Sequence, residues 1–134
     1  MQTENTNPIN ITQLFIALHT TRQEAATRLE GENLSKILID ANKQSTQFIA
    51  DLMSELSNYG DAVASTADRN NPYQILWIKN LDKIEHLDEA SSSNLFAEME
   101  LLLKNEYQLT LKGELDLPES LAQILTIQNE TISN

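Results

Sequence analysis

Residues 34–59 have the sequence LSKILIDANKQSTQFIADLMSELSNY, and this stretch decides the fold. Its apolar side chains recur every three or four positions, the spacing of one face of an α-helix. This apolar stripe consists of Leu34, Ile37, Leu38, Ala41, Phe48, Leu52, Leu56 and Tyr59. Gly60 follows, where a glycine often ends a helix. A helix of about 26 residues would be roughly 39 Å long, and this length indicates a helical bundle.

A second helix is predicted just before this stretch. Its apolar positions, again at helical spacing, are Ile11, Leu14, Phe15, Leu18, Ala25 and Leu29. Gly31 is expected to end it, and the polar residues 1–9 are expected to form a disordered tail. Because only three or four residues separate the two helices, we expect them to pack antiparallel as a hairpin.

A long connection then runs from about Gly60 to Ser91. It begins as a polar loop, and Asn71-Pro72 has the pattern of a helix N-cap followed by proline in the first turn. The apolar run from Ile75 to Ile84 favours a short helix, although an apolar run alone is also compatible with a strand.

The C-terminal part is predicted to form a second hairpin. Its first helix starts at the Ser91–Ser93 run and carries an apolar stripe of Leu95, Phe96, Met99, Leu102, Leu103 and Leu109. Residues 107–117 also alternate with a period of two, a strand pattern, but the helix is preferred as far as about Leu111. Pro118 starts the last helix, with Leu121, Ile124, Leu125, Gln128 and Ile132 on its stripe.

These elements predict an all-α, ferritin-like four-helix bundle over residues 10–134. It would consist of two antiparallel helical hairpins and a long crossover carrying a short extra helix, because one long crossover is typical of the ferritin-like class. Gly and Pro number only three each, so the many tight turns of a β-sandwich or barrel are not expected.

The composition excludes several classes of function. The chain has 9 Lys and Arg against 20 Asp and Glu, a formal net charge of −11, which disfavours nucleic-acid binding and anionic membranes. It has no cysteine, so disulfides, thiolate nucleophiles and cysteine-ligated metals are absent. We expect neither a secretory signal nor a transmembrane segment, and the cysteine-free composition fits the reducing cytoplasm.

Several short segments, in this order and spacing, resemble a known family. They are Glu24-Ala25-Ala26, Gln47–Leu52, Tyr59-Gly60-Asp61, Trp77-Ile78-Lys79 and Glu98-Met99-Glu100. Over nearly the whole chain the sequence resembles the ferritin-like family called domain of unknown function 2383. The resemblance implies a small bacterial, cytoplasmic four-helix-bundle protein and supplies no settled activity.

The residues needed for a dinuclear metal centre are not in place. Ferritin-like carboxylate proteins bind iron or manganese through single Glu residues and Glu-x-x-His pairs. Here Ile16 stands three positions before His19 and Lys83 three before His86, so the chain contains no such pair. Glu24, Glu98 and Glu106 are the remaining candidate metal ligands, each more simply explained as part of a solvated face or a buried hydrogen bond. Glu98 and Glu100 are two positions apart, so only one of them can point inward.

Other polar residues have structural interpretations. Glu106 and Gln128 lie on apolar stripes, and they are predicted to form a buried polar layer with Ser45 or Arg22 that fixes helix register. His19 is expected to be partly exposed. His86 lies among acidic residues, which suggests a solvated helix end or a loose cation site. Trp77 is a candidate interface anchor, or it packs the crossover helix onto the bundle.

The sequence therefore shows no reaction. The first hypothesis is a non-enzymatic bundle without cofactors that acts through protein contacts, with homo-oligomerisation expected. A degenerate metal-binding or redox protein with weakly bound iron or manganese is the alternative. A third hypothesis, based only on the charge of −11, is an adaptor for a basic partner.

Overall fold

The structure is a computed structural model that describes residues 8–29, 36–59, 71–86, 88–113 and 117–132. Apart from a few residues at the helix ends these residues are helical, and no strand occurs among them. The α-helices are α1 (Pro8–Leu29), α2 (Lys36–Ser57), α3 (Pro72–Asn80), α4 (Glu89–Lys112) and α5 (Glu119–Ile132). A 3₁₀ segment, η2 (Leu81–His86), extends α3. The prediction of an all-α protein is confirmed for the described part of the chain.

The helix boundaries follow from capping chemistry. Asn71 caps α3, as its sequence predicts: the side-chain oxygen accepts a hydrogen bond from the backbone N–H of Gln74 at 2.9 Å, and Pro72 occupies the first turn. The expected cap of α4 in the serine run is wrong. Asp88 caps this helix instead, accepting from the Ser91 backbone N–H at 2.7 Å. A carboxylate at this position also favours the positive end of the helix dipole.

Two other boundaries differ from the expectation or fall beyond the described residues. The helix α1 starts at Pro8, so the last two residues of the expected tail are helical, and residues 1–7 lie outside the described part. Gly31 and Gly60, the predicted helix stops, lie outside it as well. The strand alternative is wrong where it overlaps α4, which continues to Lys112 and closes with a bond from Gly113 N–H to the Leu109 carbonyl.

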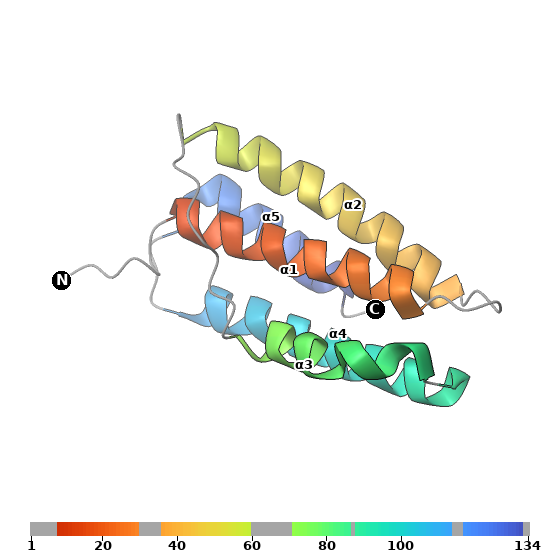
Figure 1. The fold of residues 1–134 in the computed structure, drawn as a ribbon. Coiled ribbons are helices and arrows are strands. Elements are labelled where there is room, and N and C mark those ends of the chain that lie inside the picture. The colour runs from red at the N-terminus through yellow and green to blue at the C-terminus, as the bar shows by residue number, and fades with distance from the viewer. Residues whose placement is uncertain (1–7, 30–35, 60–70, 87, 114–116, 133–134) are drawn as a thin grey trace.

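Contacts between helices define their directions. Gln23 and Thr27 on α1 pair with Thr46 and Asn42 on α2, so these two helices are antiparallel. The same argument makes α2 antiparallel to α5 through the pairs Gln128–Phe48 and Ser120–Glu55. The helices α1 and α4 are also antiparallel, because the bonded pairs between them are Arg22–Glu100 and His19–Tyr107. The helix α3 with η2 runs back along α1 and α4, so that α4 starts near the end where α2 starts (Figure 1).

The hydrophobic core lies between these helices, and α1 is at its centre. Phe15, Leu18, Ala25 and Ala26 of α1 are fully buried. Each fully buried large apolar side chain contributes about 1.5–3 kcal/mol relative to an exposed one. The core members from the other helices are Leu38, Ala41, Leu52, Tyr73, Trp77, Leu95, Phe96, Met99, Leu103, Tyr107, Leu121 and Leu125.

The predicted apolar stripes are confirmed at most positions and wrong at two. Ile37 of α2 and Leu109 of α4 are largely exposed, although both continue an apolar period. Each lies at the outer edge of its stripe, because neighbouring residues of the same helices, Leu38 and Leu111, are the ones in or against the core. None of the described helices combines the length and apolar character needed to cross a membrane.

Candidate functional site: a buried polar chain

Polar side chains from four helices meet inside the hydrophobic core. His19 and Arg22 come from α1, Ser45 from α2, Tyr107 from α4 and Gln128 from α5, and none is more than 3% exposed. His19 and Arg22 are three positions apart, so they share one inward face of α1. Burial of so many polar groups is costly unless each finds a hydrogen-bond partner.

Arg22 supplies a positive charge at one end of this series of hydrogen-bonded side chains. Its guanidinium binds Glu100 of α4 through two parallel bonds, Nη2 to Oε1 and Nε to Oε2, the latter at 2.9 Å. A third bond runs from Nη1 to the Ser45 hydroxyl at 3.1 Å. The arginine is 3% exposed and Glu100 is 25% exposed, so the ion pair spans from the core to its edge.

Donor and acceptor rules fix the direction of the other bonds. The Phe48 carbonyl can only accept, so the Gln128 amide nitrogen points toward it at 3.4 Å. The Gln128 oxygen then accepts from the Tyr107 hydroxyl at 2.6 Å. Since Tyr107 donates its one proton there, His19 must donate from Nε2 across the 2.6 Å contact with the tyrosine oxygen. Nδ1 of neutral His19 is left to accept from Ser45 at 3.0 Å.

Electrostatics favour this neutral tautomer. Burial lowers the pKa of His19 well below its usual range, and the positive charge of Arg22 lowers it further. Burial raises the pKa of Tyr107, an effect that the charge of Arg22 opposes. Both groups are therefore uncharged at neutral pH, and Arg22 with Glu100 carries the charge in this part of the core.

The serine and histidine have the chemistry of a nucleophile and its base, because a neutral imidazole nitrogen accepts the hydroxyl proton at 3.0 Å. A reaction also needs a place for a substrate next to the hydroxyl. Ser45 is fully buried and accepts a bond from Arg22, and both nitrogens of the imidazole are engaged. The arrangement therefore joins helices and does not present a nucleophile.

A second polar cluster joins α2 to α5. The Glu55 carboxylate, 3% exposed, accepts from the Ser120 hydroxyl in the first turn of α5 at 2.8 Å and from the Tyr59 hydroxyl. Burial, and then the bond to Glu55, raises the pKa of Tyr59 above its ordinary value. The carboxylate also faces the positive end of the α5 dipole, which stabilises its charge.

The predicted metal ligands are not brought together. Glu24 is 53% exposed on α1 and lies 3.9 Å from Arg28, while Glu98 is exposed on α4 and Glu106 is half-buried. Glu100 is the member of the 98/100 pair that points inward. No group of three or more His, Asp or Glu side chains with metal-binding geometry occurs in the described part of the chain. The side chain of His86 lies outside that part.

The expected polar layer is present with a different membership. Gln128, Ser45 and Arg22 belong to it, as the sequence suggests, whereas Glu106 takes no part in the bonds that connect them. The expectation of a partly exposed His19 is wrong, because this residue is fully buried. The signal for His19 was its position directly after Leu18 and three residues before Arg22. Tyr107 was signalled by its spacing of four from Leu103.

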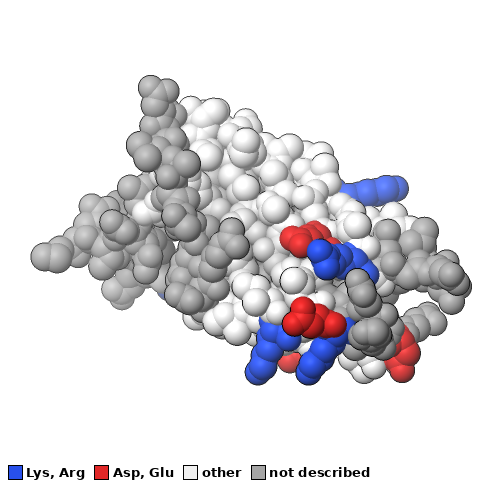
Figure 2. All heavy atoms as spheres, viewed as in Figure 1, with Lys and Arg blue, Asp and Glu red and all other residues white. Residues whose placement is uncertain are grey.

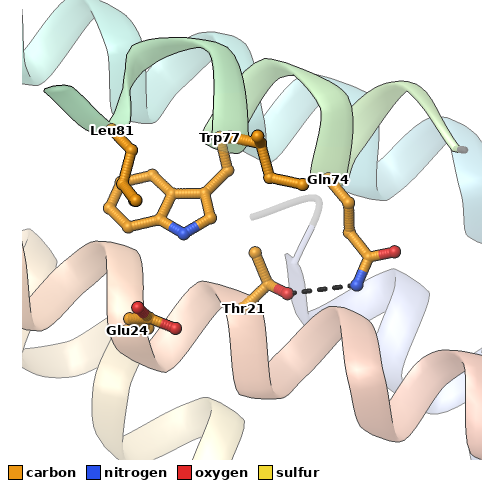
Figure 3. A pocket seen from close by; sticks show the side chains of 6 residues that line it. Thr21, Glu24, Gln74, Trp77 and Leu81 are labelled. Carbon is orange, nitrogen blue, oxygen red and sulfur yellow. Dashed lines mark hydrogen bonds between the residues drawn. The ribbon is translucent and has the colours of Figure 1, made fainter. Parts of the chain in front are cut away.

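A cavity of about 190 Å³ opens between α1 and the α3–η2 segment. Its lining residues are Thr21, Glu24, Gln74, Trp77, Ile78 and Leu81. The Gln74 amide donates to the Thr21 hydroxyl at 3.2 Å and so ties α3 to α1 at one side of the cavity (Figure 3). Trp77 is only 4% exposed and belongs to the core, so its indole forms a wall of the cavity.

Comparison with protein families, curated proteins and solved structures found no match to this chain. The site is therefore interpreted from its own geometry.

Proposed function

We propose that this chain is a non-enzymatic protein of ferritin-like four-helix-bundle topology that acts through protein contacts, first of all with copies of itself. The observation that carries the proposal is an uncharged surface on a strongly acidic chain. On the face viewed in Figure 1, charged side chains gather toward the end where α1 ends and α2 begins, and a broad area over α1 and α2 away from that end shows none (Figure 2). Interface centres are depleted in charged residues, and this face has that character.

The α1–α2 seam illustrates this surface chemistry. Its exposed hydrogen bonds, Gln23 to Thr46 at 2.6 Å and Asn42 to Thr27 at 3.2 Å, join neutral groups only. Large apolar side chains are also exposed on several helices: Ile37, Met53, Ile75, Ile78, Leu101, Leu109 and Ile127. Two copies with a net charge of −11 repel each other, so they would associate through a surface that carries few carboxylates.

The helix directions support the ferritin-like assignment. The helices α1 and α2 form one antiparallel pair, α4 and α5 form the other, and α3 with η2 lies in the connection. Since α2 and α4 run the same way, that connection must return along the molecule, which is the one-crossover arrangement of ferritin-like folds. The sequence resemblance described above agrees with this topology.

The centre of the molecule supports a role without metal chemistry. In dinuclear bundles the inward carboxylates balance the charge of the metal ions. Here the inward Glu100 is already bound on both oxygens by Arg22, and the interior imidazole is bound on both nitrogens. Elemental analysis of protein purified without chelators tests this part of the proposal. Stoichiometric iron or manganese would contradict it.

Sedimentation velocity at micromolar concentrations tests self-association. We expect an oligomer that strengthens with added salt, because salt screens the repulsion between acidic copies. A variant with Thr20→Glu and Thr46→Glu adds one exposed charge to each helix of the α1–α2 surface and should shift the protein toward monomer. Its matched control, Gln123→Glu with Thr126→Glu, adds the same charge to exposed positions on α5 and should leave the oligomer unchanged.

A monomer at every salt concentration would contradict the proposal of self-association. Binding that weakens with salt, seen only when a basic protein is added, would instead support the adaptor hypothesis. Equal effects of the two double variants would show that net charge and not the α1–α2 surface controls association.

A further inference from the structure

Most of the polar groups that line the cavity beside Trp77 already form hydrogen bonds within the protein. The Thr21 hydroxyl donates to the Ala17 carbonyl at 3.0 Å and accepts from Gln74. The Gln74 oxygen accepts from the Asn71 side chain at 2.8 Å. These bonds hold the cavity in shape, because they fix α3 at a set distance from α1.

Two groups in the wall keep capacity for a ligand. No hydrogen bond to the Trp77 indole N–H is found within the described part of the chain, and Figure 3 shows this nitrogen directed toward α1, above Thr21 and Glu24. The Glu24 carboxylate has Arg28 Nε at 3.9 Å, which is an ion-pair distance and too long for a hydrogen bond. The cavity therefore offers one neutral donor and one negatively charged acceptor.

The other walls are apolar. Ile78, Leu81 and the indole ring line an open cavity of about 190 Å³, which is the share of about six water molecules at roughly 30 Å³ each. A ligand of about seven non-hydrogen atoms has this size. An indole wall also attracts cations through its ring face, most strongly where water is excluded.

We propose that this cavity binds a small organic cation that carries one oxygen acceptor, such as an alkylammonium alcohol. Its positive group lies against Glu24, its oxygen accepts from the Trp77 indole N–H, and its carbon atoms pack on Ile78 and Leu81. The net charge of −11 raises the local concentration of such cations. The site lies on α1, α3 and η2, and the choline test below does not depend on the self-association proposed above.

Fluorescence titration with choline as the probe tests the proposal, because Trp77 is the sole tryptophan of the chain. We expect saturable binding with a Kd on the order of 1 mM, a value typical of ligands this small. The neutral isostere 3,3-dimethylbutan-1-ol has the same shape and no charge, so it should bind at least about tenfold more weakly.

Two matched variants locate the charge contact. Glu24→Gln should weaken choline binding about tenfold, as expected for the loss of one charge contact. Glu98→Gln removes the same charge from an exposed position on α4 and should leave the affinity unchanged. Absence of saturation, equal binding of the neutral isostere, or equal effects of the two variants would each overturn the proposal.

Discussion

The imidazole Nε2 of His19 lies 2.6 Å from the hydroxyl oxygen of Tyr107, joining residues 88 positions apart in the sequence. This contact ties α1 of the first hairpin to α4 of the second. Together with the bonds to Ser45 and Gln128 it links four helices through one continuous series of donors and acceptors. A shift in helix register would leave these buried donors and acceptors without partners and would therefore be costly.

Removal of the Tyr107 hydroxyl should destabilise the protein. Tyr107→Phe leaves both His19 Nε2 and the Gln128 oxygen without a partner in the core, at a cost of about 1–3 kcal/mol for each group. Urea unfolding measures this loss. Tyr73→Phe is the matched control: the Tyr73 hydroxyl is buried with no hydrogen-bond partner among the described residues, so its removal should be neutral or slightly stabilising. Equal losses in the two variants would show that the Tyr107 hydroxyl has no special role.

Stability should fall when the pH drops below the ordinary pKa of histidine. The pKa of His19 is lowered in the folded state, so the unfolded chain takes up a proton first. Its contribution to stability is complete above about pH 6.5 and is lost as the pH falls toward the folded pKa, at up to about 1.4 kcal/mol per pH unit. Urea unfolding across this range measures the slope. His19→Gln should flatten it while His86→Gln should not, and the same slope in all three proteins would contradict the assignment.

Removal of the acidic partner of the Arg22–Glu100 pair should destabilise the protein more than removal of the basic partner. Glu100→Gln leaves a 3% exposed guanidinium without its counter-ion and should cost about 3 kcal/mol, near the range for breaking buried pairs. Arg22→Met leaves a carboxylate that is 25% exposed and can still reach water, so its loss should be smaller. The control is Glu24→Gln in the exposed pair with Arg28, which should change stability by less than about 0.5 kcal/mol. Chemical denaturation measures the free energy of unfolding of each variant. An order of losses other than Glu100→Gln, then Arg22→Met, then Glu24→Gln would refute this interpretation.

The cap of α3 should control the position of Trp77. Asn71→Ala removes the acceptor for the Gln74 backbone N–H and should cost about 1 kcal/mol. The emission of Trp77 should shift to the red as α3 loosens from α1 and water reaches the indole. Asn71→Asp keeps the oxygen that accepts from the Gln74 backbone N–H but loses the donor to the Gln74 side-chain oxygen, so it should restore the capping contribution only. An unchanged emission in Asn71→Ala would mean that α3 is held by its core contacts alone.

The helices could be predicted from the sequence because their signals are local. The spacing of the apolar residues indicated which face of each helix points inward, and Asn71-Pro72 indicated where α3 starts. Asp88 was missed as a cap because three serines follow it and compete for the same role. Ile37 and Leu109 show the limit of periodicity, since an apolar stripe does not tell which positions at its edge are covered by a neighbouring helix.

The polar site was harder to predict, because its partners lie far apart in the chain. Gln128, Ser45 and Arg22 interrupted apolar stripes and could be recognised, whereas a histidine has no apolar character that marks it as buried. Glu106 and Glu100 could not be ranked from spacing, because the choice depends on which face of α4 meets Arg22. That orientation is set by the packing of α4 against α1 and is absent from the local sequence.

Nitrogen NMR of the histidine side chains tests the central claim most directly. Spectra of ¹⁵N-labelled protein, assigned with His86→Gln, report which ring nitrogen of His19 carries the proton. The structure predicts a neutral ring with the proton on Nε2 and an unprotonated Nδ1, unchanged on acidification until the protein unfolds. A proton on Nδ1, or a reversible titration of His19 near pH 6.5 in the folded protein, would contradict the account.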